Sequence, residues 1–241
     1  MTLSARPYLQ KISIRPELPL DLDSYPFSIP AVKELDCLKF HPDVTFLVGE
    51  NGAGKSTVLE AIAVAMGFGA EGGTRSMQLL RTTDSVSRLH EALSLGKSFR
   101  KPADGYFLRA ESLFNVATYM DAIGSLDPSL HARSHGEAFM QLLTQKFRGN
   151  GLYLLDEPEA ALSPNRQLAA LSAIHQLVQD ESQFIIATHS PILLAYPGAK
   201  IYQFHAEGIS EIAYEDTEHF AITRDFLNHY PRRLEQLLRD E

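Results

Sequence analysis

Short apolar runs, separated by turn residues and by amphipathic stretches, predict alternating strands and helices. Three nearly unbroken apolar runs lie at residues 44–48, 152–155 and 184–187, and each is followed by polar or glycine-rich residues. Such runs are typical of strands that are buried on both faces of a parallel sheet. The pattern therefore predicts an α/β protein with a mostly parallel central sheet.

A helical periodicity lies between the last two of these runs. Proline is well placed at the first position of a helix, and the stretch that begins at Pro164 has an apolar face. The apolar residues on that face are Leu168, Leu171, Ile174, Leu177 and Val178. This segment predicts a strand, crossover helix, strand unit. Another helix is expected over residues 56–66, directly after the first run.

The flanking parts of the chain have different patterns. Residues 8–40 carry four prolines and predict short antiparallel strands and turns. Residues from about 75 to 130 look mostly helical, with one strand at 106–109. After residue 201, two short strand-like segments precede a polar helical tail, which is most simply a solvated helix.

Length and composition are those of one folded domain. The chain has 241 residues, 44% hydrophobic and 22% charged, which excludes a disordered tail protein and a fibrous repeat. We expect a single domain over 1–241 with a helical lobe at roughly 75–135. The net charge of −8 supplies no wide basic surface for nucleic acid, although a local basic patch remains open.

Cysteine content and hydropathy favour a cytoplasmic protein. The single cysteine, Cys37, cannot form an intrachain disulfide, and the first residues lack the apolar core of a secretory signal. No apolar stretch approaches the roughly 18 to 20 residues that a membrane helix requires. We therefore expect no direct membrane insertion, and a role at a membrane would need a partner chain.

A phosphate-binding motif follows the first apolar run. Residues 49–57 read GENGAGKST and satisfy the pattern G-x-x-x-x-G-K-[ST] between an expected strand and an expected helix. Glycines let backbone N–H groups turn around the phosphates, and the helix N-terminus adds partial positive charge. Lys55 adds a full charge, and the Ser56 hydroxyl is a candidate ligand for Mg²⁺. The alternative is a glycine-rich turn that only caps a helix, and the position of the motif between a strand and a helix disfavours it. The expected nucleotide-binding residues are Gly49, Asn51, Gly52, Ala53, Gly54, Lys55, Ser56 and Thr57.

Two other sequence motifs are rejected because the neighbouring residues do not fit them. Residues 67–72 match the dinucleotide fingerprint G-x-G-x-x-G, but they follow an expected helix rather than a strand. His131 and His135 are spaced for zinc on a helix, but the glutamate of H-E-x-x-H is absent. We expect a loop at the first pattern and no metal site at the second.

Acidic residues end the second apolar run, and a histidine follows the third. Asp156 and Glu157 should lie at the carboxyl edge of the sheet, beside the phosphate loop. Asp156 is the candidate holder of Mg²⁺, usually through water, and Glu157 the candidate base for the attacking water. His189 should emerge at the same edge and reach a γ-phosphate. Each of these residues alone could be an ordinary solvated residue after a strand. Because they occur together with the phosphate loop, a catalytic role is favoured.

The three segments GENGAGKST, LYLLDEPEAALSP and IIATHSP together resemble the ABC ATPases, and within them small soluble ATPases grouped with AAA-type proteins. The resemblance implies that Asp156 and Glu157 form the Walker B motif and that His189 is the switch histidine. It also implies ATP as the nucleotide and an ATP-sandwiched homodimer. In such a dimer the partner-site signature of this chain falls on Ser134, Gly136 and Glu137.

The chain departs from the usual family pattern in several places. The signature LSGGQ reads RSHGE here, and the usual aspartate of the D-loop falls on Ser163. The glutamine of the Q-loop is sought among residues 109–112. The spacing of 79 residues between Lys55 and Ser134 excludes the long coiled coils of the chromosome-maintenance and break-repair ATPases.

The sequence is compatible with three functional hypotheses. The first is a Mg²⁺-dependent ATPase that closes as a dimer over two ATP molecules. The second is a nucleotide-controlled module that presents a surface to DNA or to a protein. The third is the motor subunit of a membrane transporter, which needs a membrane partner and is disfavoured by the divergent signature.

Overall fold

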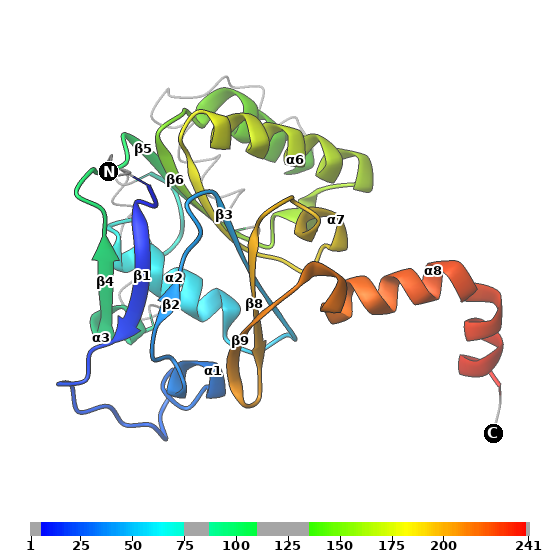
Figure 1. The fold of residues 1–241 in the computed structure, drawn as a ribbon, viewed down its shortest axis with the longest axis horizontal. Helices are drawn as coiled ribbons and strands as arrows, with labels where there is room; N and C mark the ends of the chain where they lie inside the picture. Colours follow the sequence, from blue (N-terminus) through cyan, green and yellow to red (C-terminus); the bar gives the residue numbers. More distant parts are fainter. Residues whose placement is uncertain (1–5, 75–86, 110–134, 240–241) are drawn as a thin grey trace.

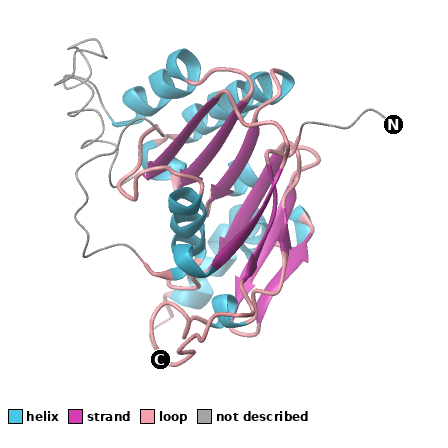
Figure 2. Cartoon of the chain, turned by 90° about the vertical axis from the view of Figure 1, so that its left-hand side faces the viewer, coloured by secondary structure: helices cyan, strands magenta, loops and turns pink. Residues whose placement is uncertain are grey.

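A six-stranded sheet forms the centre of the molecule (Figures 1 and 2). The computed structural model describes residues 6–74, 87–109 and 135–239. The strands follow the spatial order β5 (Asp104–Arg109), β6 (Gly151–Asp156), β7 (Gln183–Ala187), β3 (Val44–Gly49), β8 (Lys200–His205) and β9 (Gly208–Ile212). The first five are parallel, and β9 pairs antiparallel with β8. Every residue of β3, β6 and β7 is buried, so the predicted α/β class and the three predicted strands are confirmed.

A second, three-stranded sheet is antiparallel and has the order β2 (Leu38–Lys39), β1 (Leu9–Ile14), β4 (Leu93–Lys97). Its first two strands and helix α1 (Pro30–Lys33) confirm the short strands and turns predicted for the N-terminal part. The buried side chain of Gln183 joins the two sheets, because its amide accepts from Leu9 N at 3.0 Å and donates to Leu9 O at 2.9 Å.

Strand β4 corrects part of the predicted helical lobe. Its five residues lie where helix was expected and pair along β1, with Ile12 opposite Leu95. Pairing with the free edge of β1 outweighs the local sequence preference, because it satisfies the backbone of both strands and buries Leu93. Helix α3 (Leu89–Ala92) precedes β4. The rest of the predicted lobe, residues 75–86 and 110–134, lies outside the described residues.

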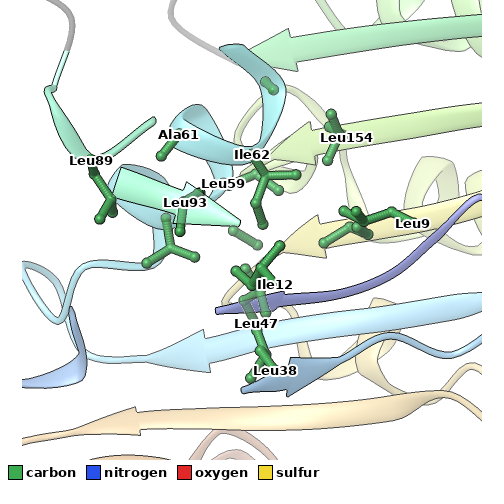
Figure 3. Close-up of a cluster of buried hydrophobic side chains, with 14 of the residues drawn as sticks. Leu9, Ile12, Leu38, Leu47, Leu59, Ala61, Ile62, Leu89, Leu93 and Leu154 are labelled. Atoms are coloured by element: carbon green, nitrogen blue, oxygen red, sulfur yellow. The ribbon is translucent and has the colours of Figure 1, made fainter. Parts of the chain in front are cut away.

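Two apolar cores lie on opposite faces of the central sheet. One lies between this sheet, helix α2 (Lys55–Ala65) and the antiparallel sheet. Figure 3 shows this core, in which Ile12 of β1 lies beside Leu47 of β3. The other core is covered by four elements: α5 (His135–Gln141), the π-helix η2 (Leu142–Lys146), α6 (Pro164–Gln179) and α7 (Pro191–Leu194).

Helix α6 begins at Pro164, as predicted, and of its predicted apolar face Ile174, Leu177 and Val178 are buried and Leu171 packs partly buried on the core, whereas Leu168 does not. Leu168 is 54% exposed, whereas the small residues Ala170 and Ala173 are buried with Ile174. The predicted apolar face of α6 was defined by large apolar residues. The small alanine side chains allow the helix to lie close to the sheet. The contact surface is therefore rotated away from Leu168.

The C-terminal helix α8 (Glu218–Leu237) extends away from the rest of the molecule (Figure 1). None of its residues is buried, and a kink lies at His229, two positions before Pro231. A 3₁₀ turn, η4 (Tyr214–Asp216), connects it to β9. These segments confirm the predicted strand-like pair followed by a solvated helix. In the part of the chain that is described, no helix combines the length and the apolar character needed to cross a membrane.

Candidate nucleotide site

The candidate residues emerge at one edge of the central sheet because three adjacent strands end there. Strand β7 lies between β6 and β3, and Ala187 pairs with Asp156 on one side and with Leu47 on the other. The ladder continues past the strand ends, since Glu157 N donates to Ala187 O at 2.9 Å and Thr188 N donates to Leu47 O at 3.2 Å. The loops after β3, β6 and β7 therefore leave the sheet side by side, as is usual for ligand sites in α/β sheets.

The phosphate loop needs its glycines for conformation and for close packing. Gly49 has φ +142°, and a Cβ there would lie 2.4 Å from the carbonyl oxygen of Phe204. Gly54 has φ +99° at the N-cap of α2, and a Cβ there would lie 2.8 Å from Ile29 Cγ2. No other residue type fits either position without displacing its neighbour. The loop is therefore held in one path into α2, whose free N–H groups and dipole favour an anion.

Lys55 is folded back onto its own loop. It is only 4% exposed, and its Nζ donates to the carbonyl oxygens of Gly49 at 2.8 Å and Glu50 at 2.9 Å. Burial lowers the pKa of the Lys55 ammonium, and the carboxylates of Glu157 and Asp156 oppose that shift. The ammonium is thus held at the loop beside two carboxylates.

Ser56 and Asp156 supply a hydroxyl and a carboxylate at one point. Ser56 Oγ donates to Asp156 Oδ1 at 2.9 Å. Burial raises the pKa of Asp156 to about 6, while the hydrogen bond from Ser56 and the charge of Arg109 act against this shift. A buried carboxylate whose charge is only partly compensated, next to a hydroxyl oxygen, fits a hard divalent cation such as Mg²⁺.

Two charged residues at this site were not predicted from the sequence. Glu60 of α2 is 9% exposed and accepts from Arg109 Nη1 at 2.6 Å. The guanidinium of Arg109, at the end of β5, also lies 3.8 Å from Asp156 Oδ2. Arg109 therefore links α2 to the end of β6. Arg109 is the first of residues 109–112, where the glutamine of the Q-loop was expected. Residues 110–112 lie outside the described part.

Glu157 lies beside the loop in a left-handed conformation, with φ +49° and ψ +51°. Left-handed backbone is uncommon for a residue other than glycine, and such strain often accompanies functional positions. Its side chain is 42% exposed, and Oε1 lies 3.5 Å from His189 Nε2. The turn therefore directs the Glu157 carboxylate toward the histidine that follows β7.

His189 contacts groups from two other segments, the turn after β6 and the start of α8. Its backbone N–H donates to Glu159 Oε1 at 2.5 Å, and its Nδ1 lies 3.0 Å from Nε2 of His219 in α8. Neither Glu159 nor His219 was singled out from the sequence. The proximity of Glu159 to Glu157 gave a weak signal, whereas His219 gave none, because thirty residues separate it from His189.

The signature segment lies against the segment that follows β6. Gly136 is buried, and a Cβ at this position would lie 2.4 Å from Ala161 O. Glu137 pairs with Arg166 Nη2 at 3.1 Å, and the first residue of α5 is His135. Ser134 lies outside the described residues. Helix α5 and the following π-helix η2 continue from the signature segment to Lys146.

The structure thus brings together the phosphate loop, Asp156, Glu157 and His189. Of the other predicted nucleotide-binding residues, Thr57 has its Oγ1 3.4 Å from the hydroxyl of Tyr25. A site of this kind can hold phosphates at the loop, a divalent cation between Ser56 and Asp156, and a water molecule near Glu157.

The AAA domain family model matches residues 26–101, which contain the whole phosphate loop. No curated protein matches the chain. Among solved structures, cbiO1 from Clostridium perfringens, part of the ABC transporter complex cbiONQ, is similar with a TM-score of 0.48 and 16% identity, over 94% of this chain and 97% of that one. The SMC head bound to the C-winged helix domain of ScpA has a TM-score of 0.45 and 16% identity, over 73% and 92%. A nucleotide-free ATP-binding cassette from an ABC transporter has a TM-score of 0.40 and 16% identity, over 85% and 91%.

Proposed function

We propose that this chain is a P-loop ATPase of the ABC type, which binds Mg-ATP and hydrolyses it to ADP and phosphate. The observation that carries the proposal is the convergence of Lys55, Ser56, Asp156, Glu157 and His189 at one sheet edge. A loop that only capped a helix would not need Asp156, Glu157 and His189 beside it.

Each residue has a distinct part in the proposed reaction. The loop N–H groups and Lys55 hold the β- and γ-phosphates, for which Lys55 Nζ leaves the carbonyl oxygens of Gly49 and Glu50. Ser56 and Asp156 would hold Mg²⁺, which when bound offsets phosphate charge. Glu157 accepts the proton of the attacking water, whose oxygen bonds to the γ-phosphorus while the bond from that phosphorus to the β,γ-bridging oxygen breaks and ADP leaves.

His189 acts on the γ-phosphate rather than on the water. Its Nε2 is buried and lacks a hydrogen-bond partner in the described part of the chain, with the Glu157 carboxylate 3.5 Å away. An N–H at this atom donates to a γ-phosphate oxygen and stabilises the charge that develops in the transition state. The same contact makes the position of His189 depend on whether the γ-phosphate is present.

The active form of the proposed enzyme is a homodimer that closes over two ATP molecules. The signature segment at the start of α5 then meets the γ-phosphate of the partner's nucleotide, with Ser134, Gly136 and Glu137 at the contact. The packing of Gly136 on Ala161 supports this proposal, because it connects the signature segment to the turn that follows Glu157. Hydrolysis in one protomer can thereby affect the contact made by that protomer's own signature segment.

Titration calorimetry with Mg-ATP, together with phosphate release, tests the proposal. We expect saturable binding that requires Mg²⁺ and steady release of phosphate. The same assay with DNA present addresses the nucleotide-switched module, for which a slow basal rate should rise with DNA. Absence of Mg-ATP binding by the folded protein, shown by an unchanged melting temperature and no heat of binding, would overturn the proposed function.

A further inference from the structure

The imidazole of His189 is in contact with another imidazole, that of His219 at the start of α8. His189 Nδ1 and His219 Nε2 lie 3.0 Å apart, and the ring centroids are 5.2 Å apart. The remaining ring nitrogens, His189 Nε2 and His219 Nδ1, are both buried and have no hydrogen-bond partner in the described residues. The single hydrogen bond between the rings therefore decides where the proton of each neutral imidazole resides.

Only one of the two arrangements suits the neighbourhood of His189. If His189 Nδ1–H donated to His219, then His189 Nε2 would present a lone pair to the Glu157 carboxylate 3.5 Å away. That arrangement is repulsive, and it leaves no N–H for a phosphate oxygen. If His219 Nε2–H donates instead, His189 carries its proton on Nε2, where it faces the carboxylate favourably.

His219 is suited to act as this donor because it is held neutral and in place. Burial lowers the pKa of His219, and the neighbouring His189 acts in the same direction. The N-cap of α8 is the fully buried Thr217, whose Oγ1 accepts from Phe220 N at 3.3 Å and donates to Tyr214 O at 2.7 Å. The start of the helix is thereby fixed beside the site.

Tyr214 attaches the same cap to the segment that carries His189. Its hydroxyl donates at 2.8 Å to the carbonyl oxygen of Pro191, two residues after His189. The ring of Tyr214 also packs on Phe220, at a centroid distance of 4.6 Å. The two histidines are therefore connected both directly and through hydrogen bonds and ring contacts of Tyr214, while most of the rest of α8 is exposed.

We propose that His219 is a positioning residue that donates its Nε2–H to His189 Nδ1 and so selects the tautomer of His189 that presents Nε2–H to the γ-phosphate. The effect of this tautomer on catalysis rests on the proposed ATPase function. The tautomer itself is a property of the nucleotide-free protein and can be tested without activity.

A pair of variants separates the hydrogen bond from the packing. His219→Phe keeps an aromatic ring but removes the donor, whereas His219→Gln keeps an N–H near the position of Nε2. We expect kcat to fall about tenfold or more in His219→Phe with little change in KM, and to recover largely in His219→Gln. His229→Gln, a change of an exposed histidine farther along α8, is the matched control and should leave kcat unchanged.

A second test asks whether His219 acts through His189. In a His189→Ala background, His219→Phe should have little further effect on kcat, because the residue that it positions is gone. An equally large additional loss would overturn the proposal and leave His219 with a structural role. A wild-type kcat in His219→Phe would overturn it directly.

Nitrogen-15 spectra of the histidine rings test the tautomer without turnover. At about pH 8, where histidine is mostly neutral, the ring shifts distinguish a protonated nitrogen from a bare one. His189, assigned by the loss of its signals in His189→Asn, should be protonated on Nε2 in the wild type, and an Nδ1–H population should appear in His219→Phe. Protonation of His189 on Nδ1 in the wild type overturns the proposal even if the protein is an active ATPase. If Nε2 is protonated but no ATP is hydrolysed, the proposed function fails and the tautomer assignment stands.

Discussion

The hydroxyl of Ser56 donates to the carboxylate of Asp156 at 2.9 Å, although one hundred positions separate the two residues. This bond connects the start of α2, which follows the phosphate loop, to the end of β6. At this site burial raises the pKa of Asp156 by more than the hydrogen bond from Ser56 and the charge of Arg109 lower it. The energetic consequence can be measured in the protein without nucleotide.

Asp156→Asn should make the metal-free protein more stable at about pH 7.5. Burial raises the pKa of Asp156 to about 6, above the ordinary 3.8 of the unfolded chain, so its charged form opposes folding. This penalty is fully present above the folded pKa and disappears as the pH falls through about 6 toward 4. We expect a gain of roughly 1–3 kcal/mol at about pH 7.5 that shrinks at lower pH. Thermal melts of both proteins at about pH 7.5 and 5 measure it.

The same variant should lose the stabilisation that Mg-ATP gives to the wild type, because an amide is a poorer ligand for Mg²⁺ than a carboxylate. Asp43→Asn, which removes a partly exposed carboxylate paired with Arg6, is the control and should keep the response to Mg-ATP. A metal-free Asp156→Asn protein that is less stable than the wild type at about pH 7.5 would contradict this account.

Lys55→Ala should weaken Mg-ATP binding by about 2–4 kcal/mol, or roughly thirtyfold to several hundredfold in Kd. The variant removes the only positively charged side chain of the phosphate loop and leaves the carbonyl oxygens of Gly49 and Glu50 without their donor. Calorimetric titration measures the affinity, and circular dichroism checks the fold. Lys33→Ala, a change of an exposed lysine in α1, should bind normally. Equal affinities of Lys55→Ala and the wild type would remove this loop as the phosphate site.

Glu157→Gln should slow hydrolysis by roughly a hundredfold or more and preserve ATP binding. The amide keeps the shape of the side chain but accepts no proton from water. Size-exclusion chromatography with Mg-ATP should then show a trapped dimer. Hydrolysis at the wild-type rate would mean that another residue is the base. Glu207→Gln, which changes an exposed carboxylate beyond β8, is a matched control.

A mixing experiment tests the composite site of the proposed dimer. Ser134→Arg and Lys55→Ala should each be inactive alone, because in a two-fold dimer each change damages both sites. A heterodimer collects both defects in one site and leaves the other intact. An equimolar mixture should therefore regain roughly a quarter of the wild-type activity if subunits exchange freely and sites act independently.

Exchange in that mixture can be verified with a tagged subunit. Strong coupling between the two sites would lower the recovered activity. Full activity of Ser134→Arg by itself would contradict the assignment of Ser134 to the partner's nucleotide. This variant is also informative because Ser134 directly precedes α5, the helix that packs on Ala161 through Gly136.

The sequence by itself determined the parts of this protein that depend on local order. Lys55 and Ser56 belong to one nine-residue motif, and Asp156 ends a buried, mostly apolar strand that Glu157 directly follows. Because such strands are buried and parallel, their carboxyl ends meet at one edge, and the order of elements sufficed to place these residues together.

Only the tertiary structure decided the contacts between residues that no local pattern connects. Arg109 reaches Glu60 because β5 lies beside β6, and Leu93 enters a strand because β1 offers a free edge. His219 meets His189 because the chain returns through β8 and β9 before it begins α8. Such contacts arise from the packing of whole elements, whose free energy is spread over many apolar side chains, so no short segment carries their signal.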